Sequence, residues 1–188
     1  GTYALISRYG MIPPVGPGQD HGPGILARSI RDGAAVMNAI VGKDAHDPAA
    51  FDFEVPDYLA TLEKGVKGMR VGIPTNFYWD LLDPEVEASV RAAIAVLAGL
   101  GAELEDVTIP FLEEAMAVTF VGTASEFHKA NLRARREDYG EDLRYWFMAQ
   151  EFTLAKDASR AQKVRDIFKA SMQRVAAKYD ALVAPTVC

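Results

Sequence analysis

A polar trio, Gln19-Asp20-His21, lies in a loop built largely from glycine and proline, and it is the strongest candidate for a ligand-binding stretch of the chain. Such a loop exposes backbone N–H groups and lets the main chain approach a bound molecule closely. The competing interpretation is a turn-rich connector with no ligand, and the pattern alone favours it. The flanking loop residues are Gly16, Pro17, Gly18, Gly22, Pro23 and Gly24.

No other group of residues forms a convincing catalytic or metal-binding set. The histidines His21, His46 and His128 share no metal-ligand spacing with each other or with Cys188. A Gly-x-Ser-x-Gly turn and a Gly-x-x-x-x-Gly-Lys phosphate loop are both absent. The cations between residues 129 and 136 lie among acidic residues, which is typical of a solvated helix face rather than an anion site. We therefore predict no metal site.

Composition indicates an ordinary globular protein of 188 residues, long enough for one domain with a sizeable core. The net charge of −6 argues against nucleic-acid binding through bulk positive charge. No apolar run reaches the ~18 residues of a membrane span. A single cysteine, Cys188, excludes an internal disulfide and fits a reducing compartment, so we predict a cytoplasmic location.

Two helix starts are well marked. Ser29, with Asp32 three residues later, predicts an N-cap, and Ile30, Ala34, Met37 and Val41 then form an apolar stripe. Gly42 follows the last apolar position, where a left-handed C-cap is expected. The second start combines a capping aspartate with a proline and acidic residues in the first turn, and consists of Asp83, Pro84, Glu85 and Glu87.

Three short apolar runs predict strands of one sheet, at residues 69–73, 103–109 and 181–184. The first two flank the helix that begins after Asp83, a strand–helix–strand order that builds parallel or mixed sheets. Residues 111–178 are mostly helical, with one or two helices up to residue 136 and two more after it. The predicted fold class is α/β, a mixed β-sheet covered by helices.

Several segments resemble one family when they are read in order. Ser7-Arg8-Tyr9-Gly10 precedes the loop, which continues with Asp20, Gly22-Pro23 and Ala27-Arg28. Near the end, a long helix leads into an apolar strand that closes on Pro185-Thr186. These segments are similar to the amidase signature family, just downstream of its nucleophile. Gly22-Pro23 follows Asp20 one residue earlier than in that family.

The resemblance implies an amidase that cleaves a carboxamide through an acyl-serine, using a serine nucleophile, a bridging serine and a lysine base, without a cofactor. In the family these residues precede the segments found here. We therefore expect residues 1–188 to be the C-terminal part of one domain, and we assign no catalytic residue within them. This part would supply strands, helical cover and pocket walls. Alone it would be inactive and prone to self-association.

Two branches of the family are compatible with the chain. In the A subunit of the tRNA-dependent glutamine amidotransferase, a helix carries paired arginines, one of which holds the carboxylate of glutamine. The matching positions here are Tyr145 and Trp146, which cannot form such bidentate bonds. The resemblance therefore favours a stand-alone amidase with a less acidic small-molecule substrate, contacted by Asp20, His21, Tyr145 and Trp146. Core packing is the equally weighted alternative for Tyr145 and Trp146.

A rival from another class is a non-catalytic α/β module that binds a partner. The chain begins with Gly and ends directly after an apolar run, so we expect further residues at both ends. A glycine- and serine-rich segment upstream, with a lysine before it, would support the enzyme. A start codon next to Thr2 would support the binding module. We expect this part of the chain neither to bind nucleic acid directly nor to associate with a membrane. The sequence is compatible with a homo-oligomer.

Overall fold

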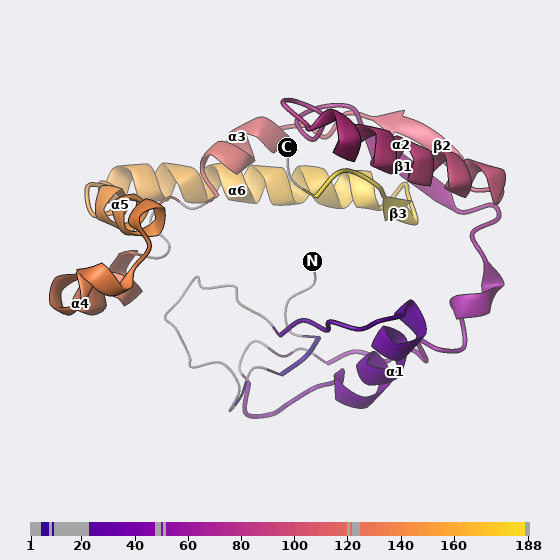
Figure 1. Ribbon diagram of the computed structural model, residues 1–188, viewed down its shortest axis with the longest axis horizontal. Coiled ribbons are helices and arrows are strands. Elements are labelled where there is room, and N and C mark those ends of the chain that lie inside the picture. Colours follow the sequence, from indigo (N-terminus) through magenta and orange to yellow (C-terminus); the bar gives the residue numbers. More distant parts are fainter. Residues whose placement is uncertain are drawn as a thin grey trace. The chain divides into compact units, whose positions relative to one another are not determined.

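The computed structural model describes residues 5–7, 9, 23–47, 50, 52–119, 121 and 125–186 of the chain, the side chains of residues 125–127 excepted. The chain divides into two compact units, Gly1–Lys64 and Gly65–Cys188. Figure 1 shows the first unit in indigo to purple and the second from magenta to yellow.

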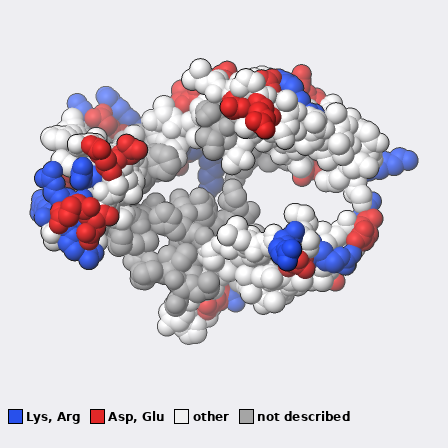
Figure 2. Space-filling view, in the orientation of Figure 1, with Lys and Arg blue, Asp and Glu red and all other residues white. Residues whose placement is uncertain are grey.

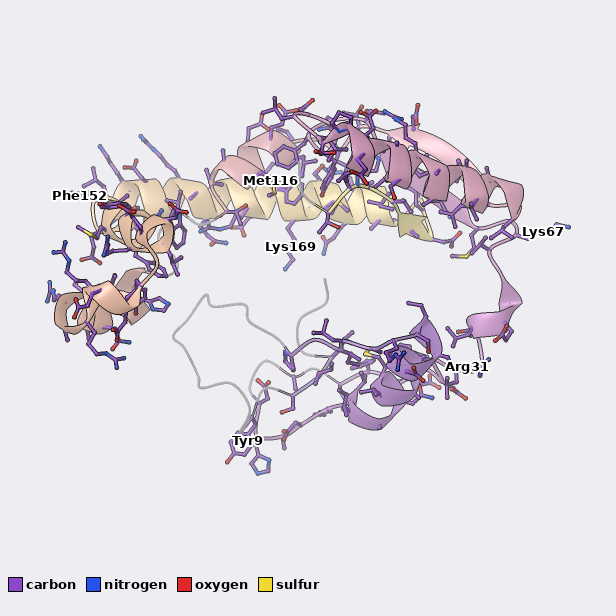
Figure 3. The ribbon with its side chains drawn as sticks, in the orientation of Figure 1. Tyr9, Arg31, Lys67, Met116, Phe152 and Lys169 are labelled. Atoms are coloured by element: carbon purple, nitrogen blue, oxygen red, sulfur yellow. The ribbon has the colours of Figure 1, made fainter. Side chains whose placement is uncertain are left out.

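The first unit is organised around helix α1 (Ile30–Ile40), which begins where the sequence predicts. The Oγ of Ser29 accepts a hydrogen bond from the amide of Asp32 at 3.1 Å, so Ser29 is the N-cap. Ala34 is buried, whereas Ile30 is 80 % exposed, so the buried stripe begins one turn later than predicted. Arg31, which Figure 3 labels, forms an ion pair with Glu63 in the short 3₁₀ helix η1 (Leu62–Lys64).

The end of α1 differs from the sequence prediction. Val41 leaves the helix in an extended conformation and forms an antiparallel bridge with Ile6. The amide of Gly42 donates to the carbonyl of Leu5 at 3.0 Å, and Gly42 has a φ of +153° rather than the left-handed helical value of about +57°. The predicted left-handed C-cap is therefore wrong, because the chain pairs with a distant segment instead of folding back on the helix.

The second unit contains a three-stranded sheet with the order β2-β1-β3, formed by β1 (Arg70–Pro74), β2 (Glu103–Val107) and β3 (Ala181–Leu182). Both pairings are parallel, with Arg70 opposite Glu103 and Val71 opposite Ala181. The three runs predicted as strands thus share one sheet, and the α/β class is confirmed. Gly72 packs closely in the middle of β1, since a Cβ there would lie 2.6 Å from Leu182 Cδ2.

Helix α2 (Pro84–Gly99) forms the crossover between β1 and β2. Asp83 is its N-cap, accepting a hydrogen bond from the amide of Glu85 at 2.8 Å, as predicted. Three consecutive aromatic residues, Phe77, Tyr78 and Trp79, precede the helix and are half-buried. The indole N–H of Trp79 donates to the carbonyl of Pro74 at 2.6 Å, and the guanidinium of Arg91 lies 4.3 Å from its ring centroid.

The other described elements of the second unit are helices. They are α3 (Leu112–Ala117), α4 (Ser125–Ala134), the 3₁₀ helix η2 (Arg136–Asp138), α5 (Glu141–Gln150) and α6 (Ala155–Ala176). The described residues between 111 and 136, predicted as one helix or two, therefore form two α-helices. Helix α6 runs beside α3 (Figure 1) and buries Ala161, Ser171 and Val175. Two side chains of α6 bind the main chain on either side of α3. Arg165 donates to the carbonyl of Val118 at 2.8 Å, and Ser171 donates to the carbonyl of Pro110 at 3.3 Å.

Candidate functional site

Helix α5 carries the two predicted site residues that the structure describes, Tyr145 and Trp146. Glu141 and Asp142 occupy its first turn, where negative charge suits the positive end of the helix dipole. Consecutive residues point about 100° apart on a helix, so Tyr145, Trp146 and Phe147 face different directions. Phe147 is buried at 3 % exposure, Trp146 is half-buried, and Tyr145 is 56 % exposed. Tyr145 is thus available for contact with another molecule.

The other two predicted site residues, Asp20 and His21, lie outside the described residues, as does the loop from residue 10 to residue 22. The proximity of that loop to Tyr145 and Trp146 therefore remains a prediction. Within the second unit, the structure brings Tyr145 and Trp146 together with an arginine and three further rings that the sequence did not single out.

Arg144 precedes this pair and was missed by the sequence analysis. Its guanidinium carbon lies 5.3 Å from the centroid of the Tyr145 ring. Its Nε is buried and has no hydrogen-bond partner among the described residues. A buried guanidinium donor without an acceptor is costly, and a carbonyl or carboxylate oxygen would satisfy it. The signal in the sequence was a single cation within the run Arg144-Tyr145-Trp146-Phe147.

An aromatic cluster, formed by His128, Tyr139, Trp146 and Phe147, joins α4 to α5. The His128 ring stacks on Phe147 with centroids 4.2 Å apart and an interplanar angle of 28°. Its Nδ1 lies 2.9 Å from the hydroxyl of Tyr139. The Trp146 ring lies 5.0 Å from that of Phe147. No local pattern marks this cluster, because its members come from α4, α5 and the residue that follows η2.

The surface around α4, η2 and α5 alternates in charge. Figure 2 shows Lys and Arg interspersed with Asp and Glu over these helices. Arg135 lies 3.5 Å from Asp138, and Lys129 lies 3.8 Å from Glu151. The prediction of a salt-bridged helix face is therefore confirmed for these pairs.

The first unit holds a second polar group, Ser7–Asp44–His46, that the sequence analysis also missed. The hydroxyl of Ser7 donates to Asp44 Oδ2 at 2.5 Å, and Asp44 Oδ1 lies 3.0 Å from His46 Nδ1. His46 stacks on Tyr9, which Figure 3 labels, with ring centroids 4.8 Å apart. The hydrogen bond from Ser7, together with those from the backbone and ring of His46, lowers the pKa of Asp44.

The order of contacts in this group is wrong for nucleophilic catalysis. A serine is activated by a histidine that accepts its proton, and the carboxylate then orients that histidine. Here Asp44 lies between the other two, so the histidine is not in a position to act as the base. The group instead fixes the segment near Ser7 to the loop that follows α1.

Among the described residues, no three His, Cys, Asp or Glu side chains are grouped to hold a metal ion. In the same part of the chain, no helix combines the length and apolar character needed to cross a bilayer.

Comparison with known proteins resolves the family. A model of the family described as Amidase matches residues 1–188, the whole chain. The chain belongs to the amidase family. An amidase from Pseudomonas putida is 39 % identical over 171 residues, covering 89 % of this chain and 36 % of its own length. The A subunit of the glutamyl-tRNA(Gln) amidotransferase of Myxococcus xanthus is 33 % identical, covering 98 % of this chain and 43 % of its own length.

The amidase fold is also supported by solved structures. The A subunit of the glutamyl-tRNA(Gln) amidotransferase from Thermotoga maritima superposes with a TM-score of 0.74 at 30 % identity, covering 96 % of this amidase chain and 40 % of its own. The chain therefore spans less than half the length of these relatives. The resemblance found in the sequence is confirmed, and the α/β class agrees with this structure.

Proposed function

We propose that this chain is part of an amidase that hydrolyses the carboxamide of a small molecule through an acyl-serine. The match of the amidase family model to all 188 residues carries this proposal. Residues 1–188 are the C-terminal part of the amidase domain, and the serine nucleophile, bridging serine and lysine base lie outside them. This part acts by binding and positioning the substrate, whereas the serine-bearing part forms and breaks the acyl bond.

The substrate wall in this proposal is formed by α5. The half-buried Trp146 offers an apolar face, and the exposed phenol of Tyr145 offers a donor and an acceptor beside the Arg144 guanidinium. The proposal also counts Asp20 and His21, in the glycine-rich loop, as substrate-binding residues. Aromatic residues at positions 145 and 146 favour a substrate whose amide is attached to an apolar rather than a carboxylate-bearing group. We further propose that the complete enzyme is cytoplasmic and forms a homo-oligomer.

The glutamine-hydrolysing A subunit is the second candidate. Two observations support it, namely the 33 % identity to the Myxococcus xanthus protein over 98 % of the chain and the Nε of Arg144, which has no partner among the described residues. A cation at this point of α5 would suit the carboxylate of glutamine. The aromatic pair that follows it is the feature that argues for the stand-alone amidase.

A substrate panel separates these candidates. Ammonia release from benzamide, acetamide and glutamine would be measured for the complete protein that contains this chain. We expect the highest kcat/KM for benzamide, because the Trp146 and Tyr145 rings favour an apolar acyl group. A clear preference for glutamine would establish the second candidate, and no release from any amide would refute the amidase proposal.

A further inference from the structure

The orientation of α5 depends on a contact that lies outside the proposed substrate wall. Phe147 is the buried residue of this helix, and its ring is covered by His128 from α4 at 4.2 Å. Trp146 contacts the same Phe147 ring at 5.0 Å. Because a helix rotates as a rigid body, the packing of Phe147 sets the directions in which the neighbouring side chains of Trp146 and Tyr145 point.

His128 is itself held in one orientation. Its Nδ1 lies 2.9 Å from the hydroxyl of Tyr139, which can donate the hydrogen bond to a neutral imidazole. The Tyr139 ring meets the rings of His128 and Phe147 edge-on, at 88° and 89°. Offset stacking and edge-to-face contacts are the favoured geometries of aromatic pairs. A phenylalanine at position 128 would keep the stack but lose the bond that fixes the ring.

The ion pair between the same two segments is a weaker restraint. Lys129 and Glu151 lie 3.8 Å apart, and each side chain is about one-third exposed. Such partly solvated pairs contribute little to stability and are screened by salt. The buried ring contact is therefore the better candidate for fixing the rotation of α5.

We propose that His128 is a positioning residue, which stacks on Phe147 under the control of Tyr139 and so aims Tyr145 and Trp146 at the bound amide. The inference rests on the proposed function in stating that α5 faces the substrate. The coupling of His128 to Trp146 can be measured without any enzymatic activity.

Fluorescence tests that coupling directly. The chain has two tryptophans, so Trp79→Phe leaves Trp146 as the single reporter. In that background, His128→Ala should shift Trp146 emission to longer wavelength and increase its quenching by acrylamide. His128→Phe should restore most of both properties, because the stack returns. The matched control is His46→Ala, which removes a histidine stacked on Tyr9 in the other unit and should leave Trp146 emission unchanged.

The hydrogen bond is tested by a double-mutant cycle. Tyr139→Phe and His128→Phe remove the same bond from opposite sides, so the double variant should perturb Trp146 no more than either single variant. Additive effects would contradict the role assigned to Tyr139. Unchanged Trp146 emission in His128→Ala, with helix content preserved in circular dichroism, would overturn the proposal whether or not the protein is an amidase.

Kinetics then test the consequence for substrate. In the complete enzyme, His128→Ala should raise KM about two- to tenfold, the range expected for loss of one aromatic contact, with kcat changed much less. His128→Phe should return KM most of the way to the parent value. If Trp146 emission shifts while KM stays constant, α5 is positioned by His128 but does not face the substrate, and the proposal fails while the amidase function stands.

Discussion

At the scale of single residues, two groups of polar side chains differ in how their atoms are arranged. Ser7, Asp44 and His46 contain the residue types of a hydrolytic triad, but Asp44 occupies the middle position. Tyr145 is exposed, and the Nε of the neighbouring Arg144 has no hydrogen-bond partner among the described residues. The arrangement of polar atoms is therefore more informative about function than the residue types.

The Ser7–Asp44 bond should be visible in the titration of Asp44. Its pKa is lowered in the folded protein from the ordinary value of 3.8, with the Ser7 hydroxyl as the largest cause. Ser7→Ala should therefore raise the pKa of Asp44 toward that value, measured by NMR titration of the side-chain carboxyl carbon. An unchanged pKa would show that the bond to Ser7 does not form in solution.

The same bond predicts a pH dependence of stability. Because the folded pKa is depressed, the stabilisation is present above 3.8 and is lost as the pH falls through the lower folded value. Ser7→Ala should thus destabilise the chain in urea at about pH 6, and its difference from the parent sequence should shrink as the pH is lowered toward about 3. An equal difference at both pH values would contradict an origin in the charged carboxylate.

Two of the proposed substrate-binding residues have a direct kinetic test. In the complete enzyme, Tyr145→Ala and Asp20→Ala should each raise KM about two- to tenfold through lost substrate contacts, while circular dichroism and melting stay close to those of the parent. Leu143→Ala is the matched control, because it truncates another exposed side chain of α5. If KM is unchanged in both variants, neither residue belongs to the site.

At the scale of elements, sequence signals within one helical turn predicted the structure correctly. Contacts between segments distant in the sequence could not be predicted. Ser29 and Asp83 were predicted as N-caps because capping depends on residues within one turn, and both form the expected bonds. The cap at Gly42 was wrong because Val41 pairs with Ile6, far away in the sequence. The His128–Tyr139 bond, between two different elements, could not be predicted for the same reason.

The two N-caps should contribute measurably to stability. Ser29→Ala and Asp83→Ala should each lower the free energy of unfolding by ~1 kcal/mol, because each leaves a helix N–H without its acceptor. Ser89→Ala, on the exposed side of α2, makes the same chemical change as Ser29→Ala without touching a cap, and alanine is the better helix former there. Urea unfolding that fails to distinguish the cap variants from Ser89→Ala would refute this prediction.

The sheet should be intolerant of a side chain at Gly72. A Cβ there would lie 2.6 Å from Leu182 Cδ2 and 3.1 Å from Val107 Cγ1, which are side chains of the two neighbouring strands. Gly72→Ala should therefore destabilise the second unit by about 1–3 kcal/mol through overpacking. Gly99→Ala has no atom within 4 Å of the new Cβ and serves as the control. Equal urea midpoints for the two variants would show that the sheet can relax around an added methyl group.

At the scale of the whole molecule, the family match covers the entire chain, whereas the chain covers less than half of its relatives. Membership of the amidase family follows from a match over all 188 residues, and the parallel sheet with its covering helices agrees with it. The chain covers 36 % of the Pseudomonas putida amidase and 43 % of the Myxococcus xanthus protein. The activity of the complete protein is therefore a proposal in which this part binds and another part performs the chemistry.

In the proposed function the serine nucleophile lies outside residues 1–188, and covalent labelling can locate it. A serine-directed fluorophosphonate would be reacted with the complete enzyme and with this chain alone, followed by peptide mapping in a mass spectrometer. We expect one labelled serine in the complete enzyme, outside this sequence, and no label on the chain alone. Labelling with loss of activity at any of the chain's own serines, Ser7, Ser29, Ser89, Ser125, Ser159 or Ser171, would contradict the account.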